Sequence, residues 1–381
     1  MRKTGNYVNS STSGEQVRAF VPEPLPPNPP IHIDKEIRTL LGEASAEIEK
    51  LELASKLVPS QEWLLYGFVR KEAVITSQIE GTQSTLIDLL SSEENGQENE
   101  DLEEVCNYLN ALDYAWDQIT SETGLPISLR LIKETHKRLL KGARGKNKSP
   151  GQFRSSQNWI GGTRPSNALF VPPPPKEMMQ CLDEFEKYLH IESQNPLIDI
   201  ALIHVQFESI HPFLDGNGRI GRLLIALLLK NHSILNSPLL YLSLFFKRNR
   251  NVYYRLLNDV RFKGEWEEWI KFFLEGISSV SKDVIDASTK LQSLVINDRQ
   301  KLLGYSKATI ASIRLLEELP KKPIVTLHQA TELLKLTKPP VIKALNILIE
   351  CGMLTEVTGK KKDKVYRYEQ YLDILSDGTE L

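Results

Sequence analysis

The spacing of apolar residues predicts that most of this chain is α-helical. In residues 33–57 and 60–93, apolar positions recur every three or four residues, which is the period of a helix with one buried face. Ser60, with Glu62 nearby, is the expected N-cap of the second segment. Residues 93–101 are acidic and polar without this period, so we expect a loop there. Further helical patterns cover residues 102–119, 128–142, 176–190, 196–210, 219–235, 249–262 and 266–303.

Two segments lack the helical period. Residues 1–30 carry six prolines between Pro22 and Pro30, which predicts an irregular, extended segment in which Phe20, Val21 and Leu25 could anchor the chain to a surface. Residues 143–175 are rich in glycine and end in a run of four prolines. Apolar residues stand on both sides of the Gly161–Gly162 pair, as expected for a short β-hairpin. A long irregular stretch inside a compact domain is usually functional or disordered.

The last 60 residues have the pattern of a separate small domain. Thr326 and Gln329 form a capping-box pattern at the start of one helix, and Thr337 is the expected N-cap of the next. Residues 354–369 then alternate around a Gly-Lys turn, as a β-hairpin does. Two helices followed by a hairpin resemble a winged helix-turn-helix.

Composition places the chain among ordinary globular proteins. Hydrophobic residues make up 41% and charged residues 25%, and 47 Lys+Arg against 49 Asp+Glu give a formal net charge of −2. No overall charge therefore indicates a polyanionic partner. The three cysteines, Cys106, Cys181 and Cys351, lie far apart, so neither a disulfide framework nor a zinc site is expected, and a reducing cytoplasm is the expected location. We expect no signal peptide and no membrane span, and we interpret residues 223–230 as a core helix.

The densest cluster of chemically useful residues is HPFLDGNGRIGR, residues 211–222. Residues 216–221 fit the pattern G-x-G-x-x-G of dinucleotide-binding folds, but that motif requires a preceding buried strand and an acidic residue about 20 positions later. The preceding segment has a helical pattern, and no acidic residue lies between Asp215 and Asp259. The dinucleotide interpretation is therefore rejected, and no Walker A sequence is present here.

The residue types in this cluster favour a phosphate ligand. Glycines let backbone N–H groups approach an anion, and a helix beginning near Gly218 adds the positive end of its dipole. Arg219 and Arg222 are three residues apart and share one helix face, where two guanidinium groups can hold a triphosphate. Asp215 offers an oxygen ligand for Mg²⁺, and a neutral His211 could accept a proton. A base, a metal ligand and an anion site together suit nucleotidyl or phosphoryl transfer.

The same twelve residues resemble the signature H-x-F-x-[DE]-G-N-G-R-x-x-R of Fic-domain proteins at every fixed position. The likeness extends to the proline-rich start, to residues 151–175, which resemble the family's flap, and to the winged-helix-like end. It implies a mainly α fold: a Fic-type helical bundle with a short β-hairpin flap, plus a C-terminal winged helix-turn-helix. The implied divisions are an N-terminal region with an inhibitory helix (1–110), a catalytic core (111–280, flap 150–175), connecting helices (281–320) and a winged-helix-like domain (321–381).

The resemblance also implies an activity, protein adenylylation. AMP would pass from ATP, with Mg²⁺, to a Ser, Thr or Tyr hydroxyl of a target protein or of the chain itself, and relatives suggest a homodimer. His211 would be the general base and Asp215 the metal ligand. The implied nucleotide-binding and target-binding residues are Gly216, Asn217, Gly218, Arg219, Ile220, Gly221, Arg222 and Tyr254 for ATP, and Ile160, Gly161 and Gly162 for the target segment.

A second motif implies inhibition. TSQIEG, residues 76–81, is similar to the family's inhibitory pattern [ST]-x-x-x-E-[GN], which makes Glu80 the inhibitory glutamate. A carboxylate that pairs with Arg222 would remove one phosphate-binding group, and a misplacement of about 1 Å can cost on the order of a hundredfold in rate.

Two other functions remain open. Within the same fold, the enzyme could transfer another phosphate-linked group or remove AMP. Alternatively, the chain could be a nucleotide-sensing DNA-binding regulator, in which GKKKDK, residues 359–364, serves as a basic wing. Residues 321–381 carry ten Lys+Arg and eight Asp+Glu, and the predicted recognition helix has few polar side chains to contact base edges, so contact with protein fits the domain at least as well.

Overall fold

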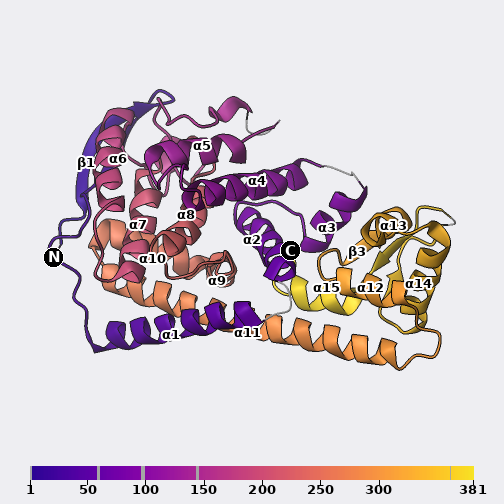
Figure 1. Ribbon diagram of the computed structural model, residues 1–381. Helices are drawn as coiled ribbons and strands as arrows, with labels where there is room; N and C mark the ends of the chain where they lie inside the picture. The colour runs from indigo at the N-terminus through magenta and orange to yellow at the C-terminus, as the bar shows by residue number, and fades with distance from the viewer. Residues whose placement is uncertain (1, 58–60, 96–98, 143–145, 361) are drawn as a thin grey trace. The chain divides into compact units, whose positions relative to one another are not determined.

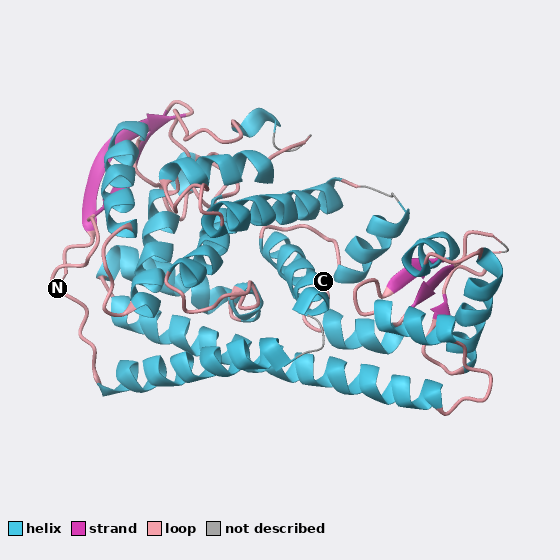
Figure 2. Cartoon of the chain, in the orientation of Figure 1, coloured by secondary structure: helices cyan, strands magenta, loops and turns pink. Residues whose placement is uncertain are grey.

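The chain folds mainly into α-helices, as predicted (Figures 1 and 2). The computed structural model describes residues 2–57, 61–95, 99–142, 146–360 and 362–381. The expected N-cap Ser60 lies outside these residues. Residue contacts divide the chain into two compact units: unit 1 holds residues 1–49 and 103–281, and unit 2 holds residues 50–102 and 282–381.

Unit 1 contains the predicted phosphate-binding segment. Its elements are β1 (Gly5–Thr12), β2 (Glu15–Pro22), α5 (Leu129–Leu139), η1 (Lys146–Lys148), η2 (Pro165–Asn167), α6 (Pro175–Leu189), α7 (Pro196–Ile210), α8 (Asn217–Asn231), α9 (Ser243–Arg248) and α10 (Arg250–Lys263). Three helices, α1 (Lys35–Leu57), α4 (Glu100–Thr120) and α11 (Trp266–Leu303), have residues in both units.

Helices α7 and α8 form the centre of unit 1. Every residue of α7 from Ile200 to Ile210 is buried, and so is every residue of α8 from Arg219 to Leu229. A helix that is buried on all sides belongs to a core. Within the described part of the chain, no helix is both long and apolar enough to span a membrane.

The N-terminal segment differs from the prediction, because residues 5–22 form an antiparallel β-hairpin in which Val8 pairs with Ala19. The expectation of irregular structure was wrong for these residues. Ser13 and Gly14 both have positive φ at the tip, the conformation of a type I′ hairpin turn. The expected anchor Phe20 is buried, and its N–H donates to the Val171 carbonyl at 2.9 Å. Figure 1 shows this hairpin beside α6 at the edge of unit 1.

Unit 2 begins with a helix break that the periodicity did not predict. The segment 60–93 forms α2 (Gln61–Ile79) and α3 (Leu86–Asn95), separated by a turn in which Gly81 has φ +109°. A φ in this region favours glycine and ends the helix. Helices also enter the expected loop 93–101 from both sides, because α3 ends at Asn95 and α4 begins at Glu100.

The C-terminal part of unit 2 has the two predicted helices and the hairpin, and in addition the strand β3 and a final helix, α15, that the sequence pattern did not predict. The elements are α12 (Ile310–Glu318), β3 (Ile324–Thr326), α13 (Leu327–Leu334), α14 (Lys338–Glu350), β4 (Thr355–Glu356), β5 (Val365–Arg367) and α15 (Glu369–Ser376). The sheet order is β3-β5-β4. The capping box is confirmed, since Thr326 Oγ1 accepts from the Gln329 N–H at 3.3 Å and Gln329 Oε1 accepts from the Thr326 N–H at 2.8 Å. The assignment as a winged helix stays a prediction.

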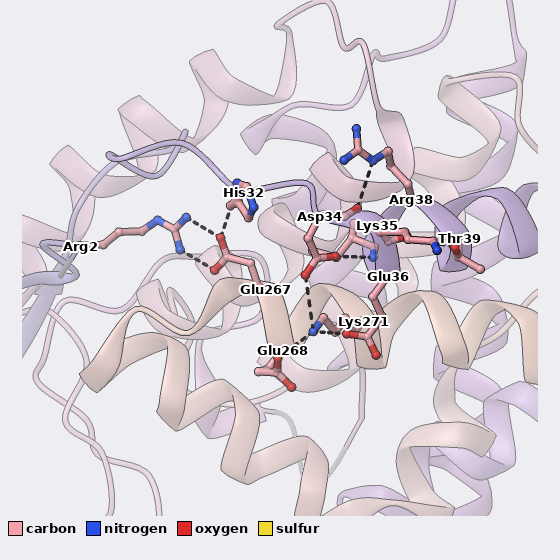
Figure 3. A network of polar contacts seen from close by, with 11 residues as sticks. Arg2, His32, Asp34, Lys35, Glu36, Arg38, Thr39, Glu267, Glu268 and Lys271 are labelled. Atoms are coloured by element: carbon pink, nitrogen blue, oxygen red, sulfur yellow. Dashed lines mark hydrogen bonds and ion pairs between the residues drawn. The ribbon is translucent and has the colours of Figure 1, made fainter.

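A polar network fastens the N-terminal segment of unit 1 to the start of α11 (Figure 3). The Arg2 guanidinium donates two hydrogen bonds to the Glu267 carboxylate, at 2.6 and 2.5 Å, and the His32 N–H donates a third at 2.9 Å. Burial by itself raises the pKa of Glu267, but these hydrogen bonds outweigh it and hold the pKa at about 2. A bidentate, partly buried pair of this kind contributes more than an exposed ion pair.

We predict that Arg2→Gln lowers the free energy of unfolding by about 1–3 kcal/mol, because it removes two charge-assisted hydrogen bonds. Urea unfolding at pH 7 measures this change. Lys187→Gln is the matched control, since the Lys187–Glu184 pair has side chains 69% and 49% exposed and its loss should leave the free energy of unfolding close to that of the parent. An equal loss of unfolding free energy in the two variants would contradict a larger contribution of the Arg2–Glu267 pair.

Candidate active site

The candidate site is built on the turn that joins α7 to α8, residues 211–216. His211 ends α7 with left-handed backbone angles, φ 49° and ψ 61°. Gly216 precedes α8 with φ 75° and ψ 6°, also left-handed, and there glycine is the residue with least strain. The two helices then lie so close that a Cβ on Gly221 would come within 2.5 Å of Glu208 Oε1. Predicted residue Gly221 therefore marks a close approach of the two helices, in which the atoms nearest to an added Cβ are the end of the Glu208 side chain and, at 3.3 Å, the ring of Phe207.

Asn217 fixes the shape of this turn through its side chain. The Phe213 N–H donates to Asn217 Oδ1 at 2.8 Å, and Asn217 Nδ2 donates to the Phe213 carbonyl at 2.9 Å. Asn217 is 2% exposed. Both the oxygen and the nitrogen of the amide bond to the turn itself, so the Asn217 side chain holds the turn.

His136 of α5 holds the other end of the turn, a role that sequence reasoning missed. The Gly151 N–H donates to His136 Nδ1 at 2.9 Å, which makes Nδ1 an acceptor and places the proton on Nε2. Nε2 then donates to the Asp215 carbonyl at 3.0 Å. The ring stacks on Phe213, with centroids 3.7 Å apart. Burial is the main cause that lowers the pKa of His136 to about 4, so the ring is neutral at pH 7.

His211, the predicted base, is also neutral at pH 7. Burial, followed by the positive charges of Arg261 and Arg154, lowers its pKa to about 3, against a smaller opposing effect of the Glu208 carbonyl. The residue as a whole is half-buried, whereas its Nδ1 atom is buried. Nε2 is therefore the ring nitrogen that a substrate can reach.

Asp215 and Arg219 meet at the start of α8. The Asp215 side chain is 48% exposed, with one oxygen accepting from the Gly216 N–H at 2.6 Å and lying 3.7 Å from Arg219 Nη2. The Arg219 side chain is 4% exposed, and Nη1 donates to Glu104 Oε2 of α4 at 3.0 Å. Glu104 was not predicted. Among the described residues, no group of three or more His, Cys, Asp and Glu side chains could hold a metal.

The other predicted nucleotide-binding residues occupy different environments. Ile220 is buried in the core and Arg222 is 4% exposed. Gly218 lies in the first turn of α8, where backbone N–H groups have no partner within the helix. Tyr254 of α10 is 40% exposed, and its ring centroid lies 5.0 Å from that of Tyr253.

The predicted flap is an irregular hairpin with a single β-bridge. Ile160 pairs with Phe170, with the Ile160 N–H donating at 2.8 Å and its carbonyl accepting at 3.1 Å. Gly161 and Gly162 turn the chain with φ 69° and 73°. Leu169, close to Gly161, is 74% exposed. The flap therefore combines one bridged residue pair with an exposed apolar side chain, that of Leu169.

Glu80 is the first residue after α2, in unit 2. It is exposed, and its N–H donates to the Ser77 carbonyl at 3.0 Å. Its predicted pairing with Arg222 stays a prediction.

Comparison with known proteins adds a family match. Residues 126–229 match the Fic/DOC family, and residues 38–117 match the Fic/DOC family N-terminal region. The protein adenylyltransferase Fic of Drosophila grimshawi is 32% identical over 157 residues, which are 40% of this chain and 29% of that protein. The corresponding protein of Drosophila yakuba is 31% identical over 157 residues, 40% of this chain and 28% of its own length. The aligned region thus spans less than a third of these relatives.

Solved structures of the same fold are similar over larger parts of the chain. A Fic family protein from Desulfovibrio desulfuricans has a TM-score of 0.56 at 20% identity, covering 89% of this chain and 97% of that one. Fic-1 from C. elegans has a TM-score of 0.52 at 21% identity, covering 66% of this chain and 73% of that one. These likenesses confirm the predicted helical fold.

We predict that Asn217→Ala lowers the free energy of unfolding by about 1–3 kcal/mol, because it leaves the buried Phe213 N–H without an acceptor. Urea unfolding measures the change. Asn251→Ala, at an exposed position of α10, should stay within about 0.5 kcal/mol of the parent protein. If Asn217→Ala is as stable as the control, Asn217 does not hold the turn.

We also predict that His136 makes unit 1 sensitive to acid. Below pH 6.5 the unfolded chain binds a proton at this residue, whereas the folded chain stays neutral down to about pH 4, so stability falls as the pH drops through this range. In His136→Gln, the free energy of unfolding should fall by on the order of 3 kcal/mol less than in the parent between pH 6.5 and 4. Urea unfolding at several pH values tests this, with exposed His190→Gln as control. A His136→Gln curve parallel to the parent would refute the prediction.

Proposed function

We propose that this chain, which carries a Fic/DOC domain behind the family's N-terminal region, is an enzyme that transfers AMP from ATP to a hydroxyl group of a protein. The observation that carries the proposal is the turn between α7 and α8. It brings a neutral histidine, an exposed carboxylate and the N-terminal end of a buried helix into one short segment. Relatives named protein adenylyltransferase support the choice of reaction.

His211 would act as the general base. Its Nε2 takes the proton of a Ser, Thr or Tyr hydroxyl, and the hydroxyl oxygen attacks the α-phosphorus of ATP. The bond between that phosphorus and the oxygen bridging to the β-phosphate breaks, and pyrophosphate leaves with the electron pair. A neutral imidazole is required at the outset, and the low pKa of His211, about 3, provides it throughout the physiological range.

The start of α8 would hold the phosphates. The backbone N–H groups of Asn217, Gly218 and Arg219 have no acceptor within the helix, and the helix dipole adds positive charge at this end. The guanidinium groups of Arg219 and Arg222 would contact the β- and γ-phosphates. Arg219 is already oriented by Glu104, which leaves further N–H groups of its fork for an anion.

Asp215 fits a role as Mg²⁺ ligand. Its carboxylate is 48% exposed at the phosphate-binding end of α8, and Mg²⁺ typically binds through one or two protein carboxylates plus substrate phosphates. When bound, the ion would neutralise charge on the phosphates of ATP.

The flap would bind the target as an added β-strand. Ile160 uses its N–H and carbonyl for Phe170, and backbone groups of a strand point alternately to its two edges. An extended target segment could pair along the opposite edge, beside Trp159 and before the chain turns at Gly161. Exposed Leu169 would contact the side chains of that segment.

Glu80 would inhibit transfer by pairing with Arg222. Its place at the end of α2, before Gly81 with φ +109°, gives it a defined position rather than a place on a loose loop. An arginine engaged by a carboxylate cannot hold the γ-phosphate, so the α-phosphate would not be aligned for attack.

DNA binding remains a prediction for the C-terminal part of unit 2. The exposed residues of α14 include Lys343 and Asn346, which could contact bases, but also Ile342 and Ile349, which are 44% and 37% exposed. Two apolar side chains on the exposed face favour contact with protein. A homodimer through this face also remains a prediction.

The proposal predicts label transfer from α-labelled ATP but not from γ-labelled ATP, with Mg²⁺ present. Glu80→Gly should raise labelling of the chain or of added proteins by on the order of tenfold to a hundredfold. His211→Ala in the Glu80→Gly background should abolish it, because no base remains. His190→Ala, at an exposed histidine, is the matched control and should label like Glu80→Gly alone.

Three outcomes would contradict the reaction, the role of His211 and the inhibition by Glu80, respectively. Label from γ-labelled ATP would mean phosphorylation. Unchanged labelling in His211→Ala would remove the catalytic assignment, and a Glu80→Gly protein no more active than the parent would remove the inhibition.

A further inference from the structure

Arg154, near the start of the flap segment 150–175, is a buried cation whose side-chain hydrogen bonds all go to backbone carbonyls. It is 2% exposed. Its Nε donates to the His211 carbonyl at 2.9 Å and its Nη2 to the Ile210 carbonyl at 3.4 Å. Nη1 donates to the Ser156 carbonyl at 3.2 Å, and Nη2 also donates to the Pro173 carbonyl. One guanidinium therefore joins the end of α7 to both ends of the flap segment.

The backbone of Arg154 takes part as well. Its N–H donates to the Pro212 carbonyl at 2.9 Å. Three successive carbonyls, those of Ile210, His211 and Pro212, thus receive hydrogen bonds from a single residue 57 positions before His211.

These hydrogen bonds satisfy carbonyl groups at the end of α7 that would otherwise have no donor. The last carbonyls of a helix have no donor within the helix, and here they are buried. His211 also occupies a left-handed conformation, φ 49°, which glycine usually takes at the end of a helix. A side chain at this position is held in a strained conformation only if its surroundings fix the backbone.

We propose that Arg154 is a positioning residue that fixes the backbone of His211 and couples it to the flap. This inference rests on the proposed role of His211 as general base. Arg154 touches neither ATP nor the target in this arrangement, and it acts by orienting the imidazole and the flap relative to each other. The base and the strand that presents the target hydroxyl would then share one rigid support.

Arginine suits this role better than lysine. A guanidinium has five N–H donors in a planar fork and can reach four carbonyls at once, whereas an ammonium group has three donors at a single point. The guanidinium is also less strongly hydrated, so its burial costs less.

The charged groups that face His211 come from three elements. Arg154 approaches from the flap side, and Arg261 of α10 approaches the same helix end, donating to Ser209 Oγ at 3.1 Å and to the Glu208 carbonyl at 3.0 Å. Glu208 lies on α7 itself. Besides burial, the two arginines lower the pKa of His211, so loss of either charge should raise it.

Two variants separate charge from geometry. Arg154→Lys keeps the charge but cannot bond to all four carbonyls, and Arg154→Met loses both. Both are made in the Glu80→Gly protein, and exposed Arg255→Gln of α10, with a side chain 61% exposed, is the matched control. The measurements are kcat and KM for AMP transfer, amide exchange of His211, and NMR titration of its ring in protein labelled with ¹⁵N-histidine, where only seven histidines contribute signals.

We expect Arg154→Lys to lower kcat by at least about tenfold with little change in KM for ATP, because alignment rather than binding is lost. Its His211 pKa should stay low, while the His211 amide, which bonds to the Phe207 carbonyl, should exchange faster. Arg154→Met should also raise the pKa of His211 toward 6.5. The control should match its parent in every measurement.

Parent-like kcat in Arg154→Lys would overturn the positioning role. If no protein transfers AMP, the proposed function fails, and the exchange and titration data still test the coupling. An amide exchange rate of His211 that is unchanged in Arg154→Lys would then overturn the coupling of Arg154 to the His211 backbone. Should Arg154→Met not fold, Arg154→Lys decides the question alone.

Discussion

The turn from His211 to Gly216 joins two helices whose facing segments, residues 200–210 and 219–229, are buried throughout, and the candidate site depends on how the backbone of this turn is held. Both ends have left-handed backbone angles, at φ 49° and 75°. Side chains from separate parts of the sequence bond to its carbonyl and N–H groups: Asn217 at Phe213, His136 at Asp215, and Arg154 at His211. A buried backbone needs such partners, and in providing them the fold also places the histidine and the helix end next to each other.

The same partners set the electrostatics of unit 1. Arg154 and Arg261 are buried, Arg154 donating to backbone carbonyls and Arg261 to the Glu208 carbonyl and the Ser209 hydroxyl. His136, His204 and His211 are kept neutral mainly by burial. His204 joins the helices of the core, with Nδ1 3.2 Å from the Gly221 carbonyl and Nε2 2.9 Å from the Tyr253 hydroxyl. An environment with fixed positive charge and neutral imidazoles suits a phosphate ester and a proton acceptor. The net charge of −2 gives no indication of these buried arginines.

Sequence reasoning succeeded where the signal is local and failed where partners are distant. The helical period and the twelve-residue motif lie in continuous stretches, so the helical fold and the candidate residues could be predicted. Arg154, His136 and Glu104 contact the motif from 57, 79 and 115 residues away, and no spacing rule connects them to it. Sequence alone also gave no sign that the Asn217 amide would be occupied by the turn.

The missed secondary structure had weaker local signals. In β1–β2 the many polar residues and the nearby prolines obscured the alternation of apolar and polar positions. The pair Ser13–Gly14, which forms the turn between the strands, was the local signal that could have predicted the hairpin. At the break after α2 the local signal is one glycine, Gly81, within an otherwise continuous apolar pattern. A single glycine is tolerated in many helices, so its effect here is decided by tertiary structure.

The most direct test of the account is mass spectrometry of proteins modified by the Glu80→Gly variant, incubated with ATP and Mg²⁺ in a cell lysate. The account predicts an added mass of one adenosine monophosphate on Ser, Thr or Tyr side chains, and no such product when His211 is also replaced by alanine. An added phosphoryl group, no adduct at all, or an adenylyl adduct that forms equally without His211 would contradict it.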